Sequence, residues 1–281
     1  MGKFDGVLLA SDFDNTLVYT SGALRSGKPI PPPGEENRKA LEYFMENGGR
    51  FCVATGRAPV AFTPLAPLVP TNAPCILSNG AVIYDFAAGE YLETFFLDET
   101  AIARAQAALD AIPEAAVEAY NPGSVICAVH SNAYVREHEL LTKIPCTEVP
   151  SMAEVIRPLV KILFEGSFET LQQVQQYFSR QGWAADCELA LSSRSLLEMT
   201  RRGISKGNTL LRLADRLGIS HQHVYAAGDE GNDISMLLAA AEGFAPANCS
   251  DTVRACGATI VSDVQDEHAI ADIIAILDSR Y

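Results

Sequence analysis

The sequence has no excess of positive charge and no long uncharged apolar run. Lys and Arg number 21 against 35 Asp and Glu, which gives a formal net charge of −14. Such an acidic chain is poorly suited to nucleic acid or to an anionic membrane surface. No apolar run approaches the roughly 20 residues that a membrane-spanning helix needs. We therefore expect neither nucleic acid nor a membrane as a partner.

The sequence also lacks CxxC pairs, and its five histidines show no metal-ligand spacing. The seven cysteines are scattered and odd in number, so we expect reduced, mostly buried thiols rather than a disulfide framework. The N-terminal segment carries Lys3 and Asp5 before it becomes strand-like, which is unlike a signal peptide. These features together predict a cytoplasmic protein.

What the sequence does contain is an alternation of buried strands and amphipathic helices. Val7–Ala10 is apolar without alternation, as in a strand buried on both faces. Gly34–Asn47 reads as a helix, and Phe51–Ala54 as a second buried strand. This order predicts an α/β fold with a mostly parallel, doubly wound, Rossmann-like sheet and right-handed crossovers. Residues 19–33 are rich in Gly and Pro, and we expect a loop there without a helix.

The segment between residues 86 and 195 has a different pattern. Strands are expected at 91–97, 124–129, 158–164 and 187–191, and helices at 99–112 and 169–181. We interpret this as an α+β domain inserted into the first, with core residues 1–85 before it and 196–281 after it.

Carboxylates and a hydroxyl follow three of the expected core strands. Asp12 and Asp14 follow the first strand, Thr55 the second and Asp229 a later one. Ligands bind at the carboxyl ends of strands in open α/β sheets. Two neighbouring carboxylates repel unless a cation lies between them or one is protonated, and Mg²⁺ suits oxygen ligands. The alternative is that Asp12–Asn15 is only a turn.

Other polar residues near the expected strand ends have two interpretations each. Thr55-Gly56 offers a hydroxyl and a backbone N–H to an anion, although such turns are common without one. Arg57 either contacts a phosphate or is solvated. Lys206 lies in the first turn of a helix, where the helix dipole disfavours a cation, and this conflict is a hint of function. Asn79 lies in an Asn-Gly hairpin signal, and Asp233 can cap a helix.

Four motifs in order along the chain resemble those of the haloacid dehalogenase superfamily. They are Asp12-Phe13-Asp14-Asn15-Thr16-Leu17, Thr55-Gly56, Gly203-Ile204-Ser205-Lys206-Gly207 and Gly228-Asp229-Glu230-Gly231-Asn232-Asp233. The third and fourth are typical of the Cof-like branch with a type IIB cap, and the inserted segment matches that cap in length and pattern. Asn15 stands where many relatives have Gly, and Ala245-Pro246-Ala247-Asn248 departs slightly from a usual Gly-Asn-Ala.

The resemblance implies a role for each matched residue. Asp12 would be the nucleophile that forms an aspartyl-phosphate, and Asp14 the general acid and base. Mg²⁺ would be held by Asp12, the Asp14 backbone carbonyl and Asp229. The phosphoryl oxygens and the substrate would be contacted by Thr55, Gly56, Arg57, Asn79 and Lys206. Asn232 and Asp233 would support the metal and substrate, directly or through water.

The activity implied is a magnesium-dependent phosphatase of small phosphorylated metabolites, with sugar phosphates favoured. A phosphomutase and a non-catalytic phosphometabolite-binding protein are the alternatives, and a monomer or homodimer is expected. The inserted domain would recognise the leaving group and determine substrate selectivity. The polar candidates for this recognition are His130, Asn132, Arg136 and Arg194. The alternative is that each is an ordinary surface residue.

Overall fold

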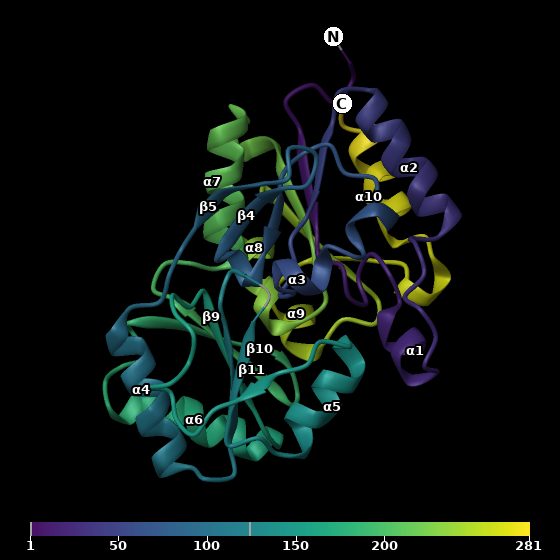
Figure 1. Ribbon diagram of the computed structural model, residues 1–281. Coiled ribbons are helices and arrows are strands. Elements are labelled where there is room, and N and C mark those ends of the chain that lie inside the picture. The colour runs from purple at the N-terminus through teal and green to yellow at the C-terminus, as the bar shows by residue number, and fades with distance from the viewer. Residues whose placement is uncertain (1, 124) are drawn as a thin grey trace.

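The computed structural model describes residues 2–123 and 125–281. The expected α/β core is present, with a second α+β body beside it (Figure 1). In the view of Figure 1 the core lies above and the second body below. Both chain termini lie at the end of the core that is remote from the second body (Figure 1). The second body is an insertion, because core strands precede and follow it along the chain.

The core is built on a five-stranded, fully parallel sheet. Its strand order is β14-β13-β12-β1-β2. The strands are β1 (Leu8–Ser11), β2 (Arg50–Val53), β12 (Val224–Ala227), β13 (Glu242–Pro246) and β14 (Thr259–Val261). All four residues of β1 are buried, because the strand has a neighbour on either edge and helices on both faces.

Side-chain alternation along β1 explains why the sheet is covered on both faces. Leu9 packs in the cluster of α2 (Glu35–Glu46) and α10 (Ala269–Asp278). Leu8 and Ala10 point the other way, to α7 (Lys206–Leu217) and α8 (Ile234–Ala239). This confirms the doubly wound α/β prediction. A short helix, α9 (Asp251–Ala255), completes the second layer.

The expectation of a helix-free loop over residues 19–33 is wrong. Helix α1 spans Thr20–Arg25 and includes Gly22. The first proline of this stretch is Pro29, which follows the helix, so no proline interrupts it. The remainder, through Pro33, forms neither helix nor strand.

A three-stranded antiparallel sheet extends the core beside β2. It is formed by β3 (Cys75–Leu77), β4 (Val82–Asp85) and β5 (Glu90–Thr94), and the turn Ser78–Gly80 joins the first two strands as the Asn-Gly signal predicts. The remaining short core helix is α3 (Pro59–Phe62).

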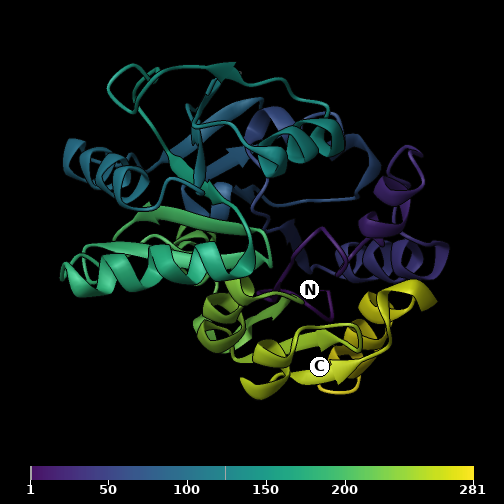
Figure 2. The same ribbon diagram turned by 90° about the horizontal axis from the view of Figure 1, so that it is seen from below.

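The second body, here called the cap, consists of a six-stranded sheet and three helices. The strand order is β10-β11-β9-β6-β7-β8, with only the β7–β8 pair parallel. The strands are β6 (Ala116–Tyr120), β7 (Ile126–Val129), β8 (Thr147–Glu148), β9 (Lys161–Glu165), β10 (Cys187–Ser193) and β11 (Leu196–Arg201). The helices are α4 (Glu99–Ala111), α5 (Ala133–Thr142) and α6 (Phe168–Arg180). Seen from the cap end, α4 and α6 run side by side along it (Figure 2).

Two strands lie on the other side of the predicted domain boundaries. Strand β5 falls within 86–195 but pairs with β4 of the core, and β11 falls within 196–281 but pairs with β9 and β10 of the cap. The predicted strand 124–129 is present as β7, and its first residue, Ser124, lies outside the described residues.

The cap sheet has one apolar face and one face that carries charge. In β9, Ile162 and Phe164 join the apolar cluster with α4 and α6. Lys161, Leu163 and Glu165 alternate with them and point to the opposite face. That second face is turned toward the core, where Leu163 joins the core's apolar cluster.

The cysteines and the helix lengths agree with the composition. All seven cysteines are free, and most are buried. Within residues 2–123 and 125–281, no helix combines the length and apolar character required to cross a bilayer.

Candidate active site

Three strand ends bring together residues that are far apart in the sequence. Strand β1 lies between β2 and β12, and all three are parallel, so their carboxyl ends meet at one edge. The backbone N–H of Asp12 donates to Ala227 O at 2.8 Å, which continues the β1–β12 ladder to the first residue of the site. Thr55 and Asp229 follow the neighbouring strands at this edge.

Asp12, Asp229 and Asp233 form a buried acidic cluster. One carboxylate oxygen from each lies within 4.8 Å of the others. The pKa of Asp12 is raised to about 7, because burial and the charges of Asp233 and Asp14 together outweigh the lowering by Lys206. Burial and the neighbouring carboxylates also raise the pKa of Asp229 well above its usual value. Three buried carboxylates beside one lysine fit a divalent cation bound by oxygen.

Lys206 is the cation that the structure places within this cluster. Its side chain is fully buried, and its Nζ lies 2.6 Å from Asp12 Oδ1 and 2.6 Å from Asp233 Oδ1. The two carboxylates raise the pKa of Lys206 against the opposing effect of burial. Lys206 begins α7, and Ser205 caps that helix by accepting from Asn208 N. The unfavourable helix-dipole position is therefore compensated by two ion pairs.

Asp14 lies outside the acidic cluster and is held by Arg57. The guanidinium donates from Nε and Nη2 to the two Asp14 oxygens, each at 2.7 Å. Burial alone would raise the pKa of Asp14, but the charge and hydrogen bonds of Arg57 lower it overall. Asp12 and Asp14 belong to one motif but have different surroundings, and their pKa values therefore shift in opposite directions.

Side-chain hydrogen bonds fix several further motif residues. Thr16 Oγ1 donates to Asp229 Oδ1 at 2.7 Å, a contact that sequence reasoning missed although Thr16 lies in the first motif. Asn232 Nδ2 donates to Asn79 Oδ1 at 2.9 Å. Asp233 Oδ2 accepts from Asp229 N and from the following backbone N–H, so Asp233 has a capping role as well.

Asn232 Oδ1 is buried and has no hydrogen-bond partner among the described residues. A buried amide oxygen without a partner is costly, and Asn232 lines the cavity beside the acidic cluster. A bound ligand or a hydrated cation at this position would supply the missing partner.

The cavity over these residues lies between the core and the cap, is partly open to solvent and has a volume of about 310 Å³. Its core wall includes Asp12, Asp14, Thr55, Gly56, Arg57, Asp229 and Asn232, and its cap wall includes Tyr120, His138, Lys161, Ser192 and Glu198. The structure therefore brings the residues of all the matched motifs, Lys206 through its contact with Asp12, to one cavity.

Lys161 is the most direct link between cap and core. Its Nζ donates to Gly56 O at 3.0 Å, lies 2.7 Å from Glu198 Oε2 and sits 4.3 Å from the centre of the Tyr120 ring. Lys161 and Glu198 are both buried. Sequence reasoning missed them, although a charged residue inside an apolar strand is a signal that could have found each one.

The polar cap residues singled out from the sequence lie elsewhere. His130, Asn132, Arg136 and Arg194 are absent from the described residues that line this cavity. Asn132 caps α5 by accepting from Tyr134 N and Val135 N. The Arg194 guanidinium lies 5.1 Å from the centre of the Phe168 ring.

Comparison with known proteins gives consistent matches over nearly the whole chain. The sequence model of haloacid dehalogenase-like hydrolases matches residues 9–274. The pyridoxal phosphate phosphatase YbhA of Escherichia coli K12 is 27% identical, over 91% of this chain and 93% of that protein. The 5-amino-6-(5-phospho-D-ribitylamino)uracil phosphatase YwtE of Bacillus subtilis 168 is 24% identical, over 97% and 99%. Among solved structures, the subclass IIB sugar phosphatase BT4131 superposes with a TM-score of 0.77 at 20% identity, covering 96% of this chain and 99% of that one.

Proposed function

The chain belongs to the haloacid dehalogenase-like hydrolase family and is a phosphatase, and we propose that it hydrolyses small phosphorylated metabolites with Mg²⁺. The observation that carries the proposal is the arrangement of Asp12 and Asp14 at one cavity, with Lys206 paired to Asp12. Sugar phosphates are the first substrate class to test. Pyridoxal phosphate and a ribityl phosphate are the next to test, because they are the substrates in the names of YbhA and YwtE.

In this proposal Asp12 attacks phosphorus and forms an aspartyl-phosphate while the substrate's alcohol oxygen leaves. Lys206 holds the Asp12 carboxylate at 2.6 Å and stabilises negative charge on the phosphoryl oxygens. Asp14 protonates the leaving oxygen and then removes a proton from the water that hydrolyses the intermediate. The first step requires Arg57 to release part of its hold on Asp14, since a carboxylate with a lowered pKa is a poor acid.

Thr55 and Gly56 would orient the transferring group from the end of β2. The Thr55 hydroxyl accepts from Arg57 N at 3.1 Å, so its own proton remains free for a phosphoryl oxygen. Asn232 borders the same space, and Asn79 accepts a hydrogen bond from it.

The residues that would hold Mg²⁺ are Asp12, Asp229 and Asp233, with the Asp14 backbone carbonyl as a further oxygen donor. When bound, the cation supplies charge neutralisation for the phosphoryl oxygens and for these carboxylates. Thr16 orients Asp229 by donating to its Oδ1, which leaves Oδ2 for the metal.

The cap would select the leaving group. Its charged face supplies Lys161 and Glu198 to the cavity, and closure over the core excludes water from the phosphoryl-transfer step. The rest of the cap wall combines the Tyr120 ring and the Ser192 hydroxyl with apolar side chains that include Leu141 and Ile144, which suits a leaving group with polar and apolar parts.

Turnover on a panel of sugar phosphates, pyridoxal phosphate and nucleotides, with and without Mg²⁺, tests the proposal. We expect release of inorganic phosphate from at least one small phosphorylated metabolite only when Mg²⁺ is present. Isomer formation without phosphate release would instead indicate a phosphomutase. Tight binding with no turnover of any compound would indicate a phosphometabolite-binding protein and overturn the catalytic roles.

A further inference from the structure

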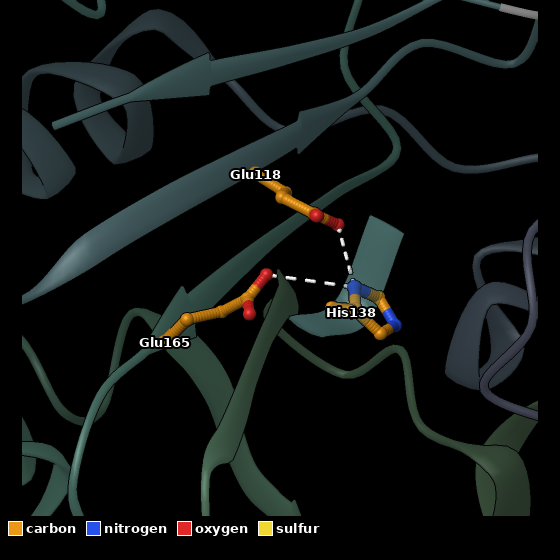
Figure 3. Close-up of side chains that lie close together, drawn as sticks. All are labelled: Glu118, His138 and Glu165. Carbon is orange, nitrogen blue, oxygen red and sulfur yellow. Dashed lines mark hydrogen bonds and ion pairs between the residues drawn. The ribbon is translucent and has the colours of Figure 1, made fainter. Parts of the chain in front are cut away.

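A second cluster of metal-ligating side chains lies in the cap, apart from the core carboxylates. It joins Glu118 of β6, Glu165 of β9 and His138 of α5 (Figure 3). One ligand atom from each of the three lies within 4.8 Å of the others. His138 Nδ1 is 3.0 Å from Glu118 Oε2 and 3.5 Å from Glu165 Oε1, and both carboxylates point to that nitrogen (Figure 3).

Glu165 is the member of this cluster without a hydrogen-bond donor among the described residues, since its 3.5 Å contact with His138 is an ion pair only. Its side chain is completely buried, and neither carboxylate oxygen has a hydrogen-bond partner among the described residues. A single N–H at His138 Nδ1 can donate well to one oxygen, and Glu118 is the nearer acceptor. A buried carboxylate without a partner carries a large desolvation penalty, so this position calls for a further cation.

Charge balance points to the same conclusion. When both glutamates are ionised, two carboxylates and one imidazolium leave one negative charge of this cluster uncompensated. The neighbouring Lys161 does not compensate it, because that ammonium is already paired with Glu198 at 2.7 Å. Two carboxylates, a neutral imidazole and a divalent cation would be neutral together.

We propose that Glu118, His138 and Glu165 form a binding site for a divalent transition metal, with Zn²⁺ as the first ion to test. One imidazole nitrogen and two carboxylate oxygens form a donor set that Zn²⁺ accepts, whereas Mg²⁺ prefers oxygen alone. The metal replaces the proton on His138 Nδ1 and gives Glu165 the partner that it lacks.

Neighbouring side chains already hold the ligands in place, as is usual around a metal centre. Tyr120 Oη donates to Glu118 Oε2, and Cys146 Sγ donates to Glu118 Oε1 at 3.3 Å. Asn132, which caps the helix of His138, donates from Nδ2 to the backbone oxygen of Glu165 at 3.2 Å. His138 belongs to α5 and lines the same cavity as Asp12. A metal bound to His138 would therefore fix the position of α5 in the cap wall of that cavity.

Zinc content of the full-length protein tests this proposal independently of phosphatase activity. Chelator-treated protein is dialysed against limiting Zn²⁺ in excess Mg²⁺, and bound zinc is measured by mass spectrometry. We expect one zinc per chain in the wild type, and at least tenfold weaker binding in Glu165→Gln and His138→Gln. Co²⁺ in place of Zn²⁺ should give a visible absorption band that both substitutions remove.

Two control variants locate the bound metal. His221→Gln alters a surface histidine that pairs with Asp215 alone, and it should keep one zinc. Asp229→Asn disrupts the core carboxylates, and it should also keep one zinc. Zinc lost in Asp229→Asn but kept in Glu165→Gln and His138→Gln would overturn the proposal. A folded wild type that binds no zinc would overturn it as well, and would leave His138 as an imidazolium shared by two glutamates. If Glu165→Gln does not fold, the wild type and His138→Gln decide the outcome.

Discussion

Arg57 and Asp14, 43 residues apart, are joined by two hydrogen bonds of 2.7 Å between a guanidinium and both oxygens of one carboxylate. The pair gives Asp14 a lowered pKa, although Asp14 lies close to Asp12, whose pKa is raised. Asp14 is thus kept ionised, whereas the pKa of Asp12 lies near neutral pH.

Replacing Arg57 with Gln should change the pH dependence of turnover. The cation stabilises the Asp14 carboxylate, so its removal raises the pKa of Asp14. The hydrolytic step needs Asp14 ionised, and we expect the acid limb of the kcat profile to move upward by about one pH unit. Steady-state rates across pH measure this shift. An unmoved acid limb in a folded Arg57→Gln protein would show that another group controls it.

Asp12→Asn should abolish turnover and preserve the fold. The amide cannot act as the nucleophile, so we expect kcat to fall by a factor on the order of 10³ or more. Lys206 keeps its second ion pair, with Asp233, which limits the structural effect. Circular dichroism checks the fold, and Asp215→Asn, on the exposed face of α7, is a matched control that should keep full activity. Substantial activity in folded Asp12→Asn would refute the covalent route.

Chelation with EDTA should stop turnover, and added Mg²⁺ should restore it. The motivation is the buried cluster of Asp12, Asp229 and Asp233. Undiminished phosphate release from metal-free protein would assign the cluster another role. Asp229→Asn should raise the Mg²⁺ concentration needed for half-maximal rate, whereas Asp251→Asn, an exposed carboxylate at the start of α9, should not.

Mg²⁺ binding to the core should weaken in acid. Asp12 has a pKa of about 7, so below that pH the cation must displace a proton. Between about pH 8 and about pH 6 we expect the affinity to fall roughly tenfold. In metal-free protein the folded state holds this proton more tightly than the unfolded state, so its free energy of unfolding should decrease as the pH rises from 3.8 to about 7. Calorimetric titration and thermal unfolding across this range measure both effects.

Exchange of the cap for that of another family member should change the preferred substrate. The core residues recognise only the phosphoryl group and the metal in our proposal, and the cap wall supplies Lys161 and Glu198. An exchange that spans Leu97–Arg201 keeps β11 with its sheet. We expect altered kcat/KM ratios across the substrate panel, with turnover still abolished by Asp12→Asn. An unchanged substrate preference after the exchange would indicate that core residues determine selectivity.

Much of the core could be predicted because its signals are local. The apolar run before Asp12 and the helix-dipole conflict at Lys206 both lie within a few residues, and the structure brings these two side chains into contact. The helix over Thr20–Arg25 was missed because the prolines that follow it dominated the composition of the stretch.

The cap chemistry could not be predicted from local patterns. Glu118, His138 and Glu165 come from three elements, and their proximity depends on the register that places Glu165 opposite Ala116 in the neighbouring strand. Helix α5 was not predicted either, because Val135 is its only buried residue and the helix shows little apolar periodicity.

The position of β1 in the sheet has a consequence for synthesis on the ribosome. Its two neighbours are β2, made soon after it, and β12, whose first residue is Val224. For most of translation β1 therefore has one unpaired edge of apolar residues, and the cap is complete before that edge is covered. The nascent chain completes the pairing of β1 only when Val224–Ala227 has been made, and chaperones that shield exposed strands would act before then.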